Sequence, residues 1–186
     1  MKRIFIATLT GAVVAFIWGY VSWQLLPWHR ADGFYNSEEV AKVIRQNTPK
    51  HGVYMLPANS IARPDAAALT QGPVIYAVVR PGELDQPWSL STRLMRSFVI
   101  QLAGSLIIAV TVYRIRARRY LSRASIGATM GIFAGLVMTL PSWNWMELPG
   151  YHTLAHLLDP VICWTLAGLA IAGIVNPPRA RRIFTR

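Results

Sequence analysis

The chain has few charged residues and almost no cysteine. Of its 186 residues, 15% are charged, and Cys163 is the single cysteine. Soluble domains carry about 25% charged residues, so this composition argues against an ordinary globular protein. One cysteine also excludes an intrachain disulfide, a paired-cysteine redox centre and a cysteine-rich zinc module.

Catalytic motifs are absent as well. The sequence contains no G-x-S-x-G, no Walker A loop, no G-x-G-x-x-G and no H-E-x-x-H, which are local patterns of several hydrolase and nucleotide-binding families. Its serines lie in no recognisable nucleophile setting. The sequence therefore predicts no catalytic residue and no cofactor, and it favours a protein that is not an enzyme.

Long apolar runs dominate the chain instead. Hydrophobic residues make up 53% of it. A helix of about 20 apolar residues crosses the roughly 30 Å hydrocarbon core of a bilayer. The first run is longer than the apolar core of a signal peptide, about 7–15 residues, so we expect it to be retained as a span. Pro141 is expected to end the third run. The predicted spans are residues 4–26, 94–113, 124–140 and 154–175.

The net charge of +11 is distributed unevenly along the chain. It is matched by eleven basic residues in three stretches that contain no acidic residue, namely 1–3, 114–123 and 176–186. Lys and Arg mark the cytoplasmic segments of membrane proteins. Both termini and the 114–123 link are therefore predicted to be cytoplasmic, and residues 27–92 extracytoplasmic. This distribution removes the argument for a nucleic-acid partner and makes anionic lipid headgroups the expected partners of the arginine clusters.

Residues 27–92 are the one long segment outside the predicted spans. Ser37, followed by two glutamates, predicts an N-capped helix, and two short apolar runs bounded by Gly or Pro predict strands. The predicted elements are a helix over 37–47, strands over 53–56 and 74–79, and a candidate helical turn over 65–69. So few elements bury little core alone. We therefore predict a single membrane domain over residues 1–186. Its fold class is all-α, a bundle of four transmembrane helices with a small extracytoplasmic α+β cap between the first and second spans.

Glycines at a spacing of four residues predict close contacts between helices. Hydrophobicity does little to associate helices in lipid, so small residues that admit a neighbouring backbone mark the interfaces. We expect these contacts to form within the chain, although a second chain could supply the partner helix. The predicted packing residues are Gly127, Gly131 and Gly135 in the third span, and Gly11 and Gly19 in the first.

Asp159 is the clearest ionisable residue inside a predicted span, where such groups are candidates for functional sites. The second span carries Arg96 and Arg93 at a similar depth. We predict an ion pair between Asp159 and Arg96, with Arg93 as the second choice. This pair has two interpretations: a structural clamp that holds the two helices in register, or a polar pocket that opens to the outer side.

Histidines near Asp159 raise the question of a metal site. His152, His156 and Asp159 share one helical face, and His29 at the end of the first span could supply a fourth ligand. Zinc and copper sites use such sets, while the alternative is a group of interfacial histidines that bind water or headgroups. Trp23 and Trp28 are among several tryptophans predicted to form an interfacial aromatic belt.

Several features together resemble a loosely defined group of small, uncharacterised four-span bacterial inner-membrane proteins. That group has no established activity. The resemblance therefore implies the four-span topology and a location in a bacterial inner membrane, but no function. His152 and His156 are not part of the shared pattern. The likeness rests on Trp18-Gly19, Ser22, Leu26-Pro27, Gly52-Val53-Tyr54-Met55-Leu56-Pro57, Leu140-Pro141, Trp143-Asn144-Trp145, Asp159 and Trp164.

Three functions agree with these observations. The first is a non-catalytic accessory or interaction subunit of the inner membrane, with a protein partner or a second copy of the chain. The second is a small oligomeric transporter or channel-like protein with a polar interior around Arg96, Gln101 and Asp159. The third is a membrane enzyme or a protein that handles metals or lipids.

Overall fold

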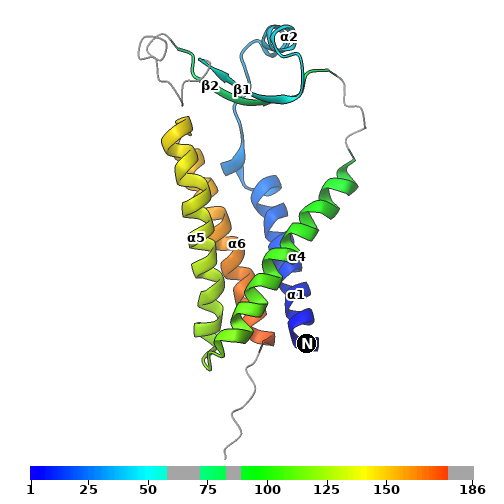
Figure 1. Ribbon diagram of the computed structural model, residues 1–186, viewed down its shortest axis with the longest axis vertical. Helices are drawn as coiled ribbons and strands as arrows, with labels where there is room; N and C mark the ends of the chain where they lie inside the picture. The colour runs from blue at the N-terminus through cyan, green and yellow to red at the C-terminus, as the bar shows by residue number, and fades with distance from the viewer. Residues whose placement is uncertain (58–71, 83–88, 176–186) are drawn as a thin grey trace, which may run out of the picture. The chain divides into compact units, whose positions relative to one another are not determined.

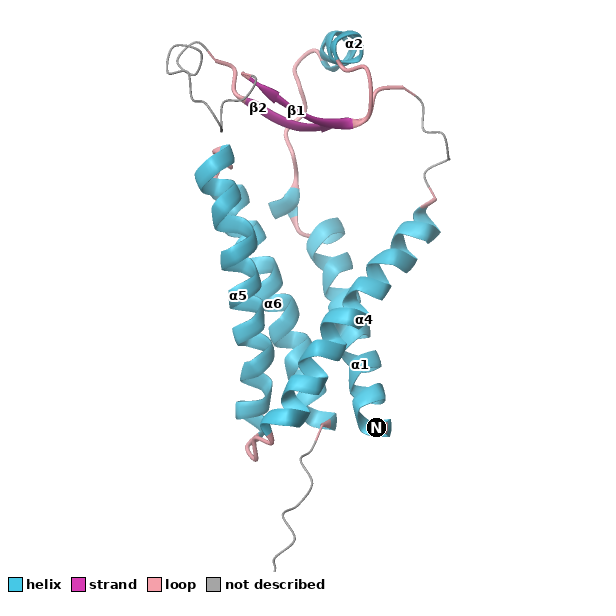
Figure 2. Cartoon of the chain, viewed as in Figure 1, coloured by secondary structure: helices cyan, strands magenta, loops and turns pink. Residues whose placement is uncertain are grey.

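The computed structural model describes residues 1–57, 72–82 and 89–175. The chain divides into two compact units, Met1–His29 with Ser89–Arg186, and Arg30–Trp88. Four helices of the first unit are long and apolar enough to cross a membrane, and the one sheet of the described residues belongs to the second unit (Figure 2). The predicted fold class, four apolar helices with a small α+β segment between the first and second, is confirmed.

Each predicted span lies almost entirely within one of these helices. The expected end of the third span at Pro141 is wrong, because α5 continues through this proline. A proline removes one backbone hydrogen bond of a helix, but a membrane helix tolerates it where other groups satisfy the freed carbonyl. The helices are α1 (Lys2–Tyr20) with its π-helical continuation η1 (Val21–Leu25), α4 (Leu90–Ile115), α5 (Tyr120–Met146) and α6 (Gly150–Ile174).

α6 is the central helix of the first unit. It packs along α5 on one side and along α1 on another, and α1 in turn packs along α4 (Figure 1). α4 is inclined to the other helices and makes only limited contact with α5 and α6. We call the end where α1 and α5 begin and α4 and α6 finish the arginine end.

The contact between α5 and α6 depends on glycine. A Cβ atom on Gly131 would lie 2.6 Å from the carbonyl oxygen of Pro160, and one on Gly135 would lie 2.6 Å from that of Leu157. Gly127 faces the backbone of Gly168 in the same way. These three glycines therefore let the two backbones approach as closely as the GxxxG pattern predicts.

The two glycines of α1 differ from each other. A Cβ atom on Gly11 would clash with Ile171 of α6, whereas one on Gly19 would meet nothing within 4 Å. The expectation that Gly19 packs against a helix is thus corrected. Eight residues separate the two positions, which turns Gly19 about 80° away from the face that holds Gly11.

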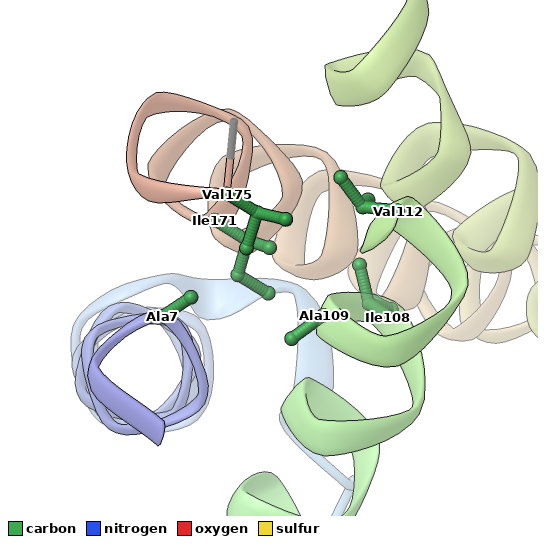
Figure 3. Close-up of a cluster of buried hydrophobic side chains, with 6 residues drawn as sticks. All are labelled: Ala7, Ile108, Ala109, Val112, Ile171 and Val175. Atoms are coloured by element: carbon green, nitrogen blue, oxygen red, sulfur yellow. The ribbon is translucent and has the colours of Figure 1, made fainter. Parts of the chain in front are cut away.

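An apolar cluster holds α1, α4 and α6 together near the arginine end (Figure 3). Beside it, the guanidinium of Arg123 is buried, with its Nε donating to the carbonyl of Ala172 and its Nη1 to those of Ala117 and Arg118. Arg123 therefore binds carbonyls of the link between α4 and α5 and of the last turn of α6. The cluster consists of Ala7, Ile108, Ala109, Val112, Ile171 and Val175.

The second unit contains one helix, α2 (Ser37–Asn47), and a hairpin-like pair of strands, β1 (Gly52–Leu56) and β2 (Ile75–Val79). The predicted cap residue is corrected by one position. The side chain of Asn36, not of Ser37, accepts from the N–H of Glu39. The strands pair antiparallel with Val53 opposite Val78. The candidate turn over 65–69 lies outside the described residues.

Candidate functional site: the polar centre of the bundle

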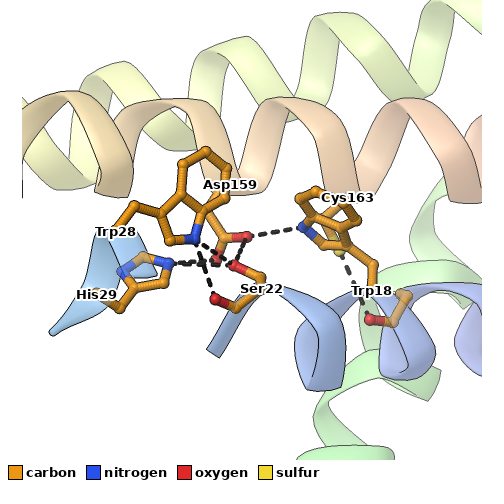
Figure 4. Close-up of polar contacts among 7 residues, drawn as sticks. Trp18, Ser22, Trp28, His29, Asp159 and Cys163 are labelled. Atoms are coloured by element: carbon orange, nitrogen blue, oxygen red, sulfur yellow. Dashed lines mark hydrogen bonds and ion pairs between the residues drawn. The ribbon is translucent and has the colours of Figure 1, made fainter. Parts of the chain in front are cut away.

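Asp159 lies at the centre of a hydrogen-bonded group between α6 and the end of α1 (Figure 4). Its Oδ1 accepts from the Trp18 indole N–H and from the Ser22 hydroxyl, both at 2.7 Å. Its Oδ2 lies 3.6 Å from Nε2 of His29. We call Trp18, Ser22, Trp28, His29 and Asp159 the polar centre. Four of these residues lie within residues 18–29, at the end of α1 and directly after it. One end of one helix therefore supplies the partners of the carboxylate.

A π-helical turn gives this helix end its shape. In η1 the N–H of Leu26 donates to the carbonyl of Val21, five residues back. The corresponding donor for the carbonyl of Ser22 would be residue 27, which is a proline and has no N–H. The indole N–H of Trp28 takes that place at 3.0 Å. Pro27 thus ends the helix and brings Trp28 and His29 back toward Ser22.

The Ser22 hydroxyl uses all of its hydrogen-bonding capacity. It donates to Asp159, because a carboxylate can only accept, and it lies 3.1 Å from both Trp28 Nε1 and His29 Nε2. With its single proton directed at Asp159, the hydroxyl must accept from His29. This assigns the proton of neutral His29 to Nε2 and leaves Nδ1 bare.

A row of three histidines links the polar centre to the start of α6: His29 belongs to the polar centre, and His156 and His152 lie on α6. The ring of His156 lies 5.0 Å from that of His29 and 5.0 Å from that of His152, centroid to centroid. Trp23 stacks on His29 at 4.1 Å with the rings nearly parallel. We call His29, His156 and His152 the histidine row. It joins the first turn of α6 to the polar centre.

Burial and charge act in opposite directions on His29. Its side chain is only 2% exposed, and this burial lowers its pKa, an effect larger than the opposing attraction of the Asp159 carboxylate. The proximity of His152 lowers the pKa of His29 further. A neutral imidazole is therefore favoured at neutral pH, which agrees with the hydrogen-bonding role of its Nε2–H.

The predicted ion pair between Asp159 and Arg96 is corrected. Within residues 1–57, 72–82 and 89–175, the close partner of the Asp159 Oδ2 is His29 Nε2 at 3.6 Å, and neither Arg96 nor Arg93 takes that place. Arg96 is exposed, and α4 makes few contacts with α6 because α1 packs against both. Gln101 lies on α4 as well, with its Oε1 buried and without a hydrogen-bond partner in the described structure. Arg96 therefore makes no ion pair with Asp159, and the buried Oε1 of Gln101 bonds to neither residue.

The four candidate metal ligands behave differently. His29, His152, His156 and Asp159 do come together as neighbours. Nevertheless, no group of three or more His, Cys, Asp or Glu among the described residues is arranged to hold a metal ion. One reason is visible at His29, whose Nε2 already contacts Ser22 and Asp159.

Sequence reasoning missed the donors to Asp159. Trp18 and Ser22 are spaced four residues apart and so share one face of the helix, which was a usable signal. Trp23 and Trp28 were expected in an interfacial aromatic belt, yet Trp28 donates to Ser22 and Trp23 stacks on His29. The turn at Pro27 brings Trp28 back to Ser22 and brings His29 against Trp23.

Comparison of the chain with protein-family models, with curated proteins and with solved structures found no match.

Proposed function

We propose that this membrane protein is a non-catalytic accessory subunit that binds a protein partner through its second unit. The observation that carries the proposal is the exposed apolar surface of that unit. Thr48 is its one buried residue over 30–57 and 72–82, while Val53 is 59%, Tyr76 46% and Val78 70% exposed.

These apolar side chains gather on one face of the sheet. Val53 lies directly opposite Val78, and Met55 opposite Tyr76, and alternate residues of a strand share a face. We call Val53, Met55, Tyr76 and Val78 the Val53 face. A two-stranded sheet is marginally stable by itself in water, so a surface that covers this face would also stabilise the fold.

The occupant that fits best is an extended segment of another protein. Within the described residues the sheet has two strands only, and each therefore has an edge of backbone N–H and C=O groups. A strand added to such an edge can pair with these groups and place apolar side chains against the face. Lipid acyl chains could cover the side chains but could not pair with the backbone.

The polar centre supports a role without catalysis. In a Ser-His-Asp triad the histidine uses one ring nitrogen for the serine and the other for the aspartate. Here the single Nε2 of His29 faces both Ser22 and Asp159, and the Ser22 hydroxyl proton is held by the carboxylate. Ser22 is also fully buried, so it is not placed to attack a substrate.

The test is a comparison of complexes extracted from native membranes in mild detergent. We expect the intact chain to migrate with a second, different protein in fixed stoichiometry. Val53→Asp and Val78→Asp should each release that protein, because they place charge on the Val53 face. Lys42→Asp, at an exposed position of α2, is the matched control and should retain it. If the variants retain the same partner, or if only lipid or a second copy of this chain is found, the proposal is wrong.

We further propose the inner membrane of a bacterium as the location, with both termini and the 114–123 link in the cytoplasm. The support is the concentration of basic residues in those segments, where anionic headgroups are the proposed partners. In a Cys163→Ser background, Ser122→Cys should resist an impermeant maleimide in intact cells, and Ser37→Cys should react. The opposite labelling pattern would reverse the orientation.

A further inference from the structure

The histidine row reaches from the beginning of α6 to a carboxylate inside the helix. His152 lies in the first turn after Gly150, and His156 lies one turn further along. Asp159 lies about two and a half turns from the helix start. Successive rings along the row are 5.0 Å apart, and each pair is inclined by 57–60°.

Two ring nitrogens in this row are buried and have no hydrogen-bond partner within the described residues. They are Nδ1 of His29 and Nδ1 of His152. A buried polar atom without a partner is costly, and each such atom in a native structure calls for an explanation. His29 also has a defined tautomer: its Nε2–H is directed at Ser22, and the lone pair on its Nδ1 is free to accept a proton.

We propose that the histidine row carries a proton from water at the start of α6 to the Asp159 carboxylate. His152 and His156 pass the proton inward, and Nδ1 of His29 accepts it. The Nε2 proton of His29 then moves to Ser22 Oγ over 3.1 Å while the Ser22 hydroxyl proton moves to Asp159 Oδ1 over 2.7 Å.

This step balances in protons and charge. One proton enters at Nδ1 of His29 and one arrives on Asp159, which becomes a neutral carboxylic acid. His29 remains neutral with its proton now on Nδ1, and Ser22 remains a hydroxyl that donates to Nε2 instead of to Asp159. No group of the polar centre loses its hydrogen-bond partner, because the chain of hydrogen bonds only reverses its direction.

Among the residues that the structure describes, the titratable groups that face His29 lie on α6. They are Asp159, His156 and His152, while the segment that carries His29 contributes tryptophans and Ser22. Cys163 follows Asp159 by one turn, and its thiol points to the carbonyl of Ala15 at 3.9 Å. Among the described residues, no Lys or Arg makes an ion pair with Asp159.

The experiment follows the protonation of Asp159 by infrared spectroscopy after a rapid drop in pH. It uses the full chain in lipid nanodiscs. A carboxylic acid C=O band should appear and should be missing in Asp159→Asn. In His156→Gln the band should form at least about tenfold more slowly but reach the same amplitude, because a relay affects the rate of proton transfer.

His51→Gln is the matched control, since His51 is an exposed histidine of the second unit. It should leave the rate unchanged. A thermal unfolding midpoint close to that of the intact chain verifies that each histidine variant keeps its fold. His152→Gln provides a second test of the row if His156→Gln fails to fold.

Two results would overturn the proposal. Equal rates in the His156→Gln, His152→Gln and His51→Gln variants would show that the proton reaches Asp159 without the row. The absence of any carboxylic acid band that depends on Asp159 would show that the proton stops before the carboxylate.

Discussion

α6 is held on two sides by contacts of different kinds. Against α5 the contact is between backbones, with Gly131 facing the carbonyl of Pro160 and Gly127 facing Gly168. Against α1 the contact is made by polar side chains that converge on Asp159. Water is absent from the bilayer core and lipid tails are as apolar as leucine, so close packing and hydrogen bonds replace hydrophobicity as the source of helix association.

The difference shows that the two interfaces tolerate different changes. The glycine interface needs small side chains but no particular chemistry, so its stability should depend on volume. The polar centre needs specific donors and acceptors at fixed distances, so its stability should depend on which atoms are removed. Four predictions test this contrast.

The largest effect is expected from Asp159→Ala. It leaves the indole N–H of Trp18 and the hydroxyl of Ser22 without their acceptor, and each buried orphan costs about 1–3 kcal/mol. We expect the free energy of unfolding to fall by at least about 1–3 kcal/mol when both groups lose their acceptor. The measurement is a thermal or denaturant titration in detergent. Asp159→Asn keeps a carbonyl oxygen at the site and should lose less. If Asp159→Ala and Asp159→Asn lower the free energy of unfolding equally, the interface does not depend on the oxygen acceptor at position 159.

A slightly smaller effect is expected from Gly131→Leu. Overpacking of a tight contact costs about 1–3 kcal/mol, and here the obstructing atoms are backbone atoms that cannot rotate away. Gly173→Leu is the matched control, because a side chain there would meet nothing within 4 Å. Similar unfolding midpoints for the two leucine variants would refute the backbone contact between α5 and α6.

Acidification should weaken the polar centre and leave the glycine interface unaffected. The pKa of His29 in the folded protein lies below its ordinary value of 6.5. The unfolded chain therefore takes up a proton first, and the free energy of unfolding should decrease as the pH falls below 6.5. The thermal midpoint of the intact chain should drop between pH of about 7.5 and about 5.5, and His29→Gln should reduce this slope. If the thermal midpoint of His29→Gln depends on pH as steeply as that of the intact chain, another group causes the pH dependence.

The smallest effect is expected from Arg96→Gln. Arg96 is exposed and does not pair with Asp159, and substitutions at exposed positions usually change stability by less than about 0.5 kcal/mol. The measurement is the same unfolding titration. A loss as large as that of Asp159→Asn would restore the ion pair that the sequence suggested.

The two interfaces also differ in how far the sequence could predict them. Glycines four residues apart share one face of a helix, whichever helix packs against that face. Gly127, Gly131 and Gly135 could therefore be recognised from their spacing alone. The partner of Asp159 could not. Charge favoured Arg96, whereas the folded chain supplies Trp18, Ser22 and His29. A carboxylate can accept from any donor within reach, and only the arrangement of the helices decides which donor that is.

The residues alone determined the number of long apolar helices, the two strands and the small helix between the first two spans, because hydrophobic length and alternation are properties of neighbours along the chain. The pairing register of the strands came from the folded chain. Folding in three dimensions decided what lies around Asp159. Proline at position 27 forces the chain to turn back after the π-helical end of α1, and α1, rather than α4, occupies the side of α6 that carries the carboxylate. Such a site joins residues more than 130 positions apart, and no local pattern records a contact over that separation.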